Sequence, residues 1–139
     1  MTKCIFCEIA DGRIPSIRVY DDPDFIVFMD INPVTAGHCL LVTRKHYETM
    51  LDVPDDLLAR ALPLARTIAE AATLGVGARG FNIISNNGEC SGQAVAHWHV
   101  HVIPRSDIKE LPLKQGDPAD LTRLPFVADA IRSNLETAK

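Results

Sequence analysis

Residues 97–103 read His-Trp-His-Val-His-Val-Ile, a run in which imidazole rings alternate with apolar side chains. Side chains along a β-strand point to opposite faces in turn, so this run predicts a strand over 97–103. The three imidazoles then share one face, about 7 Å from each to the next. Trp98 and Val100 are expected to anchor the opposite face in a core.

A single histidine on a strand is most often a half-buried residue whose ring nitrogens are hydrogen-bonded. Three alternating histidines place many ring nitrogens that need hydrogen-bond partners on one surface. Valine or threonine would pack better at these strand positions. The row therefore predicts a functional site. Two chemistries use such a row: ligation of a metal ion, and nucleophilic or acid–base catalysis by neutral imidazole.

The loop that precedes the row favours catalysis on phosphate. Residues 86–93 read Asn-Asn-Gly-Glu-Cys-Ser-Gly-Gln. Backbone N–H groups at the glycines and the side-chain amides can donate hydrogen bonds to phosphoryl oxygens without a large positive charge. We therefore expect phosphate chemistry beside the histidines.

Four further strands and two helices are expected around this strand. The strands are β-branched or aromatic runs at 17–20, 25–29, 38–43 and 81–85, separated by turn residues. A helical apolar period covers 52–72, where Pro63 predicts a kink or a break. A short C-terminal helix is indicated by Leu124, Val127, Ile131 and Leu135. Mostly short connections predict an α+β fold: a five-stranded antiparallel sheet with one long helix and a short C-terminal helix.

Length and composition predict one compact domain. The chain has 139 residues, 47% of them hydrophobic, which suits a single core. We expect this domain over residues 1–106 and a C-terminal extension over 107–139 that packs on or near it. A net charge of −4 without a Lys/Arg block argues against nucleic acid as a partner. No secretory signal or membrane-spanning run is visible, so we expect a cytoplasmic protein with no membrane partner.

The chain has four cysteines, two of which form the spacing Cys4-x-x-Cys7. In a reducing compartment this pair indicates metal binding or redox chemistry before it indicates a disulfide. The pair lacks the βαβ setting of a redox site, and a chance spacing stays open at this point. We interpret Cys39 as a buried strand residue and Cys90 as a loop thiol without an assigned role.

The row of histidines resembles the motif of the histidine-triad (HIT) family of nucleotide hydrolases and transferases, His-x-His-x-His followed by two apolar residues. The likeness extends from about residue 3 to residue 106. The other landmarks that carry it are Ile5-Phe6-Cys7-Glu8-Ile9 with Ile14-Pro15, Asp30-Ile31-Asn32-Pro33, Gly37-His38, Lys45-His46, Phe81-Asn82, Asn86 through Gly88, Gly92-Gln93 and Pro104-Arg105.

The resemblance implies a hydrolase that cleaves at the α-phosphate of a purine nucleotide derivative. The implied substrate is an adenylyl phosphoramidate or a dinucleoside polyphosphate, so the bond is a phosphorus–nitrogen or a phosphoanhydride bond. His99 is then the nucleophile and forms a covalent nucleotidyl-histidine that water hydrolyses. His101 hydrogen-bonds phosphate oxygens or helps to protonate the leaving group, and His38 lines the same pocket.

The resemblance also implies contacts to an AMP- or GMP-containing substrate. Asp30 accepts from the ribose hydroxyls, and Asn86 and Gln93 lie near the phosphates. The expected walls of the base site are Ile9, Phe28 and Ile31. Ala94 departs from the hydroxyl-bearing residue that some members use against phosphate, so the leaving-group contacts stay unassigned.

A structural zinc ion is implied as well. Many bacterial members resemble this chain in pairing a Cys-x-x-Cys with a histidine like His46 and with the first motif histidine. The implied ligands here are Cys4, Cys7, His46 and His97, a closed tetrahedral set with no open position. The resemblance thus predicts the zinc-containing bacterial-type branch, structural Zn²⁺, no organic cofactor, and a homodimer joined through the long helix and the adjoining strand.

Two other classes of function stay open. In a metallohydrolase, His97 and His99, with or without His101, would bind a catalytic zinc that lowers the pKa of a bound water. In a nucleotide-binding or partner-binding module, the fold would be kept without meaningful turnover, although the intact triad argues against this. Trapping a covalent nucleotidyl-enzyme distinguishes the hydrolase from the metallohydrolase.

Overall fold

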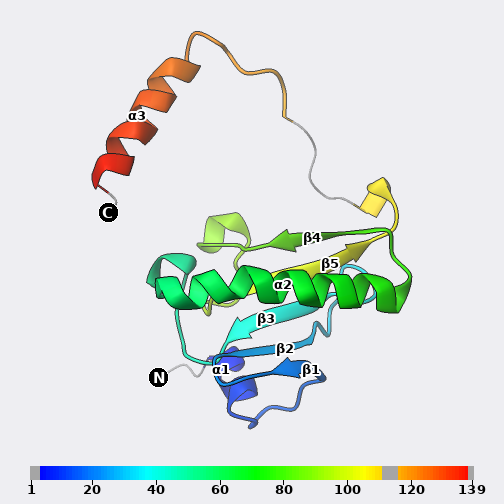
Figure 1. Cartoon of the computed structure of the whole chain (residues 1–139). Coiled ribbons are helices and arrows are strands. Elements are labelled where there is room, and N and C mark those ends of the chain that lie inside the picture. Colours follow the sequence, from blue (N-terminus) through cyan, green and yellow to red (C-terminus); the bar gives the residue numbers. More distant parts are fainter. Residues whose placement is uncertain (1–3, 111–115, 138–139) are drawn as a thin grey trace.

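The computed structural model describes residues 4–110 and 116–137, and its centre is a five-stranded antiparallel sheet with the order β1-β2-β3-β5-β4 (Figure 1). The strands are β1 (Arg18–Asp21), β2 (Phe25–Met29), β3 (Cys39–Thr43), β4 (Gly80–Ile84) and β5 (His99–Arg105). The helices are α1 (Ile5–Ala10), α2 (Asp55–Val76) and α3 (Leu124–Thr137). The predicted fold class is therefore confirmed.

Alternation along the strands gives the sheet two apolar faces, each covered by a helix. One face packs against α2, which lies across the sheet in Figure 1. The strand residues buried there are Phe25, Val27, Cys39, Leu41, Val100 and Val102, with Trp98 beside them. The other face packs against α1 and buries Ile26, Phe28, Leu40 and Val42. Burial of both faces supplies the main driving force for this arrangement.

The strand β5, which lies between β3 and β4, begins at His99, two residues later than the predicted strand over 97–103. The backbone of the two preceding residues bonds outside the sheet: the His97 N–H donates to the Val95 carbonyl at 2.8 Å, and the Trp98 N–H donates to the Tyr47 carbonyl at 2.6 Å. The expectation that His97 lies in the same strand as the other two histidines is therefore wrong.

The long helix α2 also begins and ends later than predicted. A 3-10 turn over Met50–Asp52, closed by a capping box between Thr49 and Asp52, includes the residue at which the helix was expected to begin. At the other end Gly77 adopts a left-handed conformation, with φ of 70°, and terminates the helix.

The helix α2 is continuous through Pro63, so the predicted break is wrong. Proline removes one hydrogen bond to the carbonyl four residues earlier, here Ala59. Both Pro63 and Ala59 lie on the exposed side of the helix. Water can therefore hydrogen-bond the freed carbonyl, which makes the proline tolerable at this position.

Two shorter helices complete the described structure. The helix α1 was not predicted, because six residues are too few to show a clear period, although Phe6, Ile9 and Ala10 are spaced as one helical face and are buried. The predicted C-terminal helix is present as α3, and its large apolar side chains are exposed in the single chain. The packing of residues 107–139 on the domain stays a prediction. Among the described residues, no helix is long and apolar enough to cross a membrane.

Candidate active site

Strand β5 places two of the three motif histidines on the face of the sheet that α1 covers. His101 lies beside Leu40 of β3 and His99 beside Val42, and their ring centroids are 4.9 Å apart. Phe6 of α1 contacts the His99 ring edge-on, with centroids 5.0 Å apart. The two imidazoles are therefore packed between the sheet and α1.

Main-chain carbonyls fix the tautomers of His97 and His99. The His99 Nδ1 lies 2.7 Å from the His97 carbonyl oxygen, and the His97 Nε2 lies 2.7 Å from the Thr43 carbonyl oxygen. A carbonyl only accepts, so each of these ring nitrogens carries the hydrogen. The lone pair of neutral His99 is consequently on Nε2, and that of His97 is on Nδ1.

A relay from a backbone amide fixes the tautomer of His101. The Val34 N–H donates to His38 Nδ1 at 3.1 Å, so the hydrogen of neutral His38 is on Nε2. His38 Nε2 lies 2.9 Å from His101 Nδ1 and donates to it. Neutral His101 must then carry its own hydrogen on Nε2. The pair His99 and His101 thus offers one lone pair and one N–H from adjacent rings.

Burial keeps these rings neutral near pH 7. It lowers the pKa of both His97 and His101 to about 4, and it lowers the pKa of His99 and His38 below the usual value. Asp30 opposes the shift at His101 through its charge. A neutral imidazole with a free ring nitrogen is the form that acts as a nucleophile.

A cleft of about 390 Å³ opens beside His99 and His101. Ile9, Phe28, Asp30 and Ile31, the residues expected to contact the base and the ribose, line it. The Asp30 carboxylate accepts from the Asn32 N–H at 2.8 Å and lies 3.5 Å from His38 Nε2. Lining residues to which the sequence alone gave no role are Ile5, Phe6, Ser16, Met29, Leu40 and Val95.

The loop residues expected near the phosphates are placed differently. The Gln93 side chain accepts from the Gly88 N–H at 2.8 Å and donates to the Glu48 carbonyl at 2.7 Å, so its amide holds the loop. Neither Gln93 nor Asn86 lines the cleft. Their contacts with phosphate stay predictions.

Cys4, Cys7, His46 and His97 converge at the N-terminal end of α1, with their ligand atoms all within 4.8 Å of one another. The His46 and His97 Nδ1 atoms are 3.2 Å apart, and three sulfur–nitrogen distances are 3.4, 3.4 and 3.5 Å. A tetrahedral ion with ordinary bond lengths would require edges of about 3.3 Å between nitrogens and about 3.6 Å between nitrogen and sulfur. The donor set therefore fits one tetrahedral metal ion.

The ionisation of this group would change on binding a cation. The His97 lone pair faces the other ligands, because its Nε2–H is bound to Thr43. Burial and the neighbouring Cys4 raise the pKa of the Cys7 thiol to about 11. A cation at the centre favours the thiolate and accepts the lone pairs that otherwise face one another.

The geometry disfavours one catalytic metal shared by the three motif histidines. Among the residues described, His97 groups with the cysteines, His101 groups with Asp30 and His38, and His99 belongs to neither group. In the second group the Val34 N–H occupies His38 Nδ1 and leaves Nε2 protonated, so that nitrogen has no lone pair for a metal.

Comparisons with known proteins place this chain among relatives of known family and fold. The HIT domain description matches residues 11–108. The chain is 37% identical over 119 residues to an adenosine 5'-monophosphoramidase of Saccharomyces cerevisiae, covering 86% of this chain and 72% of the relative. A crystal structure from Streptococcus mutans is 39% identical with a TM-score of 0.86, over 97% of this chain and 87% of that one. The structure of a zinc-bound histidine triad family protein from Mycobacterium smegmatis is 34% identical with a TM-score of 0.75. The match covers 99% of this chain and 98% of that one.

The depressed pKa of His101 predicts a loss of stability in acid. Its imidazole binds a proton near pH 6.5 in the unfolded chain but only at about pH 4 in the folded chain. The stabilisation is therefore complete above pH 6.5 and is lost as the pH falls toward 4. Urea unfolding of the unsubstituted protein should show the free energy of unfolding falling across this pH range. In His101→Asn the free energy of unfolding should fall by less. Equal pH dependence in the two proteins would contradict the assignment.

Proposed function

The chain belongs to the HIT domain family, and on this premise we propose that it is a nucleotidyl hydrolase with His99 as its nucleophile. The observation that carries the proposal is the pair of fixed tautomers at the cleft. The Nε2 lone pair of His99 is available because its Nδ1–H is bound to the His97 carbonyl, and the His101 Nε2–H is available because His38 donates to His101 Nδ1. This combination suits attack on phosphorus together with proton donation.

In the proposed reaction, His99 Nε2 attacks the α-phosphorus of a nucleotide held in the cleft. A phosphorus–nitrogen bond forms as the bond from phosphorus to the leaving group breaks. His101 Nε2–H hydrogen-bonds a phosphoryl oxygen; where it gives its proton to the leaving group, it takes one back from the attacking water of the second step. Water then displaces His99 from phosphorus, which releases a nucleoside monophosphate and restores the imidazole.

The proposed substrate is a purine nucleotide derivative, containing AMP or GMP, with a phosphoramidate or phosphoanhydride bond. The apolar cleft walls at Ile9 and Phe28 suit a base, and the Asp30 carboxylate at the cleft edge suits the ribose hydroxyls. The name of the Saccharomyces cerevisiae relative, an adenosine 5'-monophosphoramidase, favours the adenylyl phosphoramidate over the dinucleoside polyphosphate.

Turnover and trapping test the nucleophile directly. The protein is incubated with adenylyl and guanylyl phosphoramidates and dinucleoside polyphosphates, and release of nucleoside monophosphate is measured. We expect His99→Ala to lower turnover by at least about 10³-fold and to abolish the covalent nucleotidyl-enzyme. AMP binding by calorimetry should persist in the variant. Absence of turnover across the panel in the unsubstituted protein would favour a binding module.

We further propose that Cys4, Cys7, His46 and His97 hold a structural Zn²⁺ ion. Support comes from the fit of the donor distances to a tetrahedron and from the zinc-bound Mycobacterium smegmatis neighbour. With four protein ligands the ion would have no open position for water, so it would hold α1 against the segment that enters β5. With a zinc ion at this site, the chain would belong to a zinc-containing branch of the family.

Metal analysis of protein purified without a chelator should find one zinc per chain. Cys4→Ser should remove most of it, because one of the four ligands is lost. Cys90→Ser is the matched control: its thiol is exposed and outside the ligand group, so the zinc content should stay unchanged. Full zinc content in Cys4→Ser would refute the site.

The proposed assembly is a homodimer joined through α2 and β4 into a continuous sheet. β4 is an edge strand with β5 as its single neighbour, and an apolar groove of about 290 Å³ lies between α2 and the sheet. Leu62 lines the groove and is 66% exposed. Light scattering at micromolar concentration should give a dimer, and Leu62→Asp should give a monomer. A monomeric unsubstituted protein would contradict this assembly.

A further inference from the structure

The short helix α1 serves two parts of the site at once. Its N-terminal end carries Cys4 and Cys7 of the metal-ligand group, while Ile5 and Ile9 line the cleft. Its buried Phe6 contacts the His99 ring edge-on. A displacement of α1 would therefore change the cleft wall and the thiol pair together.

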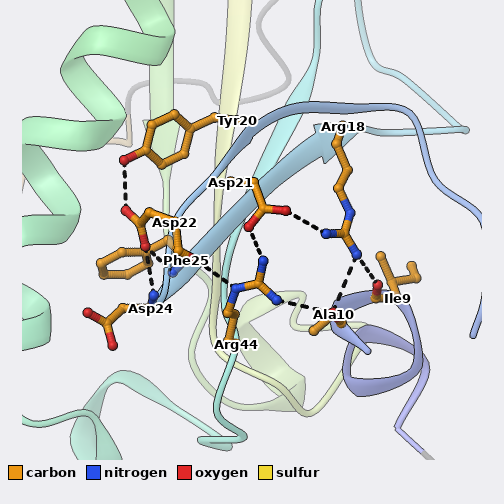
Figure 2. A network of polar contacts seen from close by, with 9 residues as sticks. All are labelled: Ile9, Ala10, Arg18, Tyr20, Asp21, Asp22, Asp24, Phe25 and Arg44. Atoms are coloured by element: carbon orange, nitrogen blue, oxygen red, sulfur yellow. Dashed lines mark hydrogen bonds and ion pairs between the residues drawn. The ribbon is translucent and has the colours of Figure 1, made fainter. Parts of the chain in front are cut away.

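Two arginines from the sheet bind the C-terminal end of α1 (Figure 2). Arg18 Nη2 donates to the Ile9 carbonyl at 2.6 Å, and Arg44 Nη1 donates to the Ala10 carbonyl at 3.2 Å. The last carbonyls of a helix lack partners within the helix, and cations are favoured at that end. The guanidinium groups supply both the missing donors and the favourable charge.

A carboxylate links the two arginines. Asp21 accepts from Arg18 Nη1 at 2.7 Å through one oxygen and from Arg44 Nη2 through the other. We call Arg18, Asp21 and Arg44 the α1 clasp. Two segments of the chain supply the α1 clasp: Arg18 and Asp21 lie in β1, and Arg44 directly follows β3.

The turn between β1 and β2 gives the clasp a rigid base. Asp22 accepts from the backbone N–H groups of Asp24 and Phe25, each at 2.7 Å, and from the Tyr20 hydroxyl at 2.7 Å. Arg44 Nε donates to the Asp22 carbonyl at 2.6 Å. Figure 2 shows the Tyr20 hydroxyl and the two turn amides converging on the Asp22 carboxylate, and Arg44 lying between this turn and the end of α1.

The clasp is partly exposed, which limits its contribution to global stability. The side chains of Arg18, Arg44 and Asp21 are 28%, 30% and 46% exposed. Exposed ion pairs contribute little to the stability of a whole domain. The bonds to Ile9 and Ala10, by contrast, act at the end of a six-residue helix that is too short to be stable by itself. Their effect is therefore expected to be local to α1.

We propose that Arg18 and Arg44, joined through Asp21, are positioning residues that hold α1 in register with the catalytic strand and so keep the nucleotide cleft closed on one side. They do not touch the reacting atoms. The link to substrate affinity rests on the proposed function, whereas the link to the order of α1 does not. Because the backbone of the histidine segment fixes the tautomer of His99, loss of the clasp should change binding more than chemistry.

Arg44→Met tests the proposal, since methionine keeps an apolar stem and removes all three donating nitrogens. We expect amide hydrogen exchange in a peptide spanning residues 4–12 to become about ten-fold faster, with exchange in β2 and β3 unchanged. KM for the nucleotide should rise by about three-fold or more, and kcat should fall less. Arg44→Lys, which keeps one donor group, should give intermediate values.

Arg60→Met is the matched control, because Arg60 pairs with Asp24 at 2.6 Å in the same turn without contacting α1. It should leave exchange in residues 4–12 unchanged. Asp21→Asn removes the charge that links the two arginines and keeps both of them. We expect it to accelerate exchange in residues 4–12 by less than Arg44→Met does. The proposal is overturned if exchange in α1 is unchanged in Arg44→Met, or if Arg60→Met accelerates it equally.

Failure of the proposed function is separable from failure of the clasp. Hydrogen exchange and AMP affinity measured by calorimetry do not depend on turnover. Weaker AMP binding with faster α1 exchange supports the clasp even where no substrate of the panel is cleaved. Unchanged exchange overturns it even where hydrolysis is fully established.

Discussion

A neutral imidazole has one nitrogen that donates and one that accepts, and the backbone of this protein decides which is which. The His97 carbonyl accepts from the ring of His99, and the Thr43 carbonyl accepts from the ring of His97. The Val34 amide donates to the ring of His38. The remaining nitrogen of His99 faces the cleft, that of His97 faces the two cysteines, and that of His38 faces the ring of His101. Without these main-chain bonds, His97, His99, His38 and, through His38, His101 would have no defined tautomers.

The second constraint is the two-residue period of the central sheet. Because neighbouring side chains face opposite ways, β5 can bury Val100 and Val102 under α2 while it presents His99 and His101 to the cleft. The same interior position in the sheet buries His99 and His101, and this burial lowers the pKa of both imidazoles. Core packing and the neutrality of these two rings therefore both depend on the place of β5 between β3 and β4.

The sequence predicted features that depend on short-range pattern. The strands, the long helix and the alternation of His99 with His101 follow from period and turn chemistry, and the structure has them close to their expected positions. It did not predict features that depend on distant partners. The start of β5 is set by Tyr47, which takes the Trp98 N–H, and the amide of Gln93 is held by Glu48. Neither partner is visible in a local pattern, and α1 was missed because six residues show too little period.

His97 serves two purposes through two different parts of the residue, its backbone and its ring. The atom that holds the tautomer of His99 is the carbonyl oxygen of His97, whereas the atom that faces the cysteines is a nitrogen of its ring. Every amino acid has that carbonyl, but few have such a nitrogen. Substitution of residue 97 and its thiol partners could therefore remove the proposed metal site from this scaffold, and the proposed nucleophile two residues further along the chain would keep its tautomer.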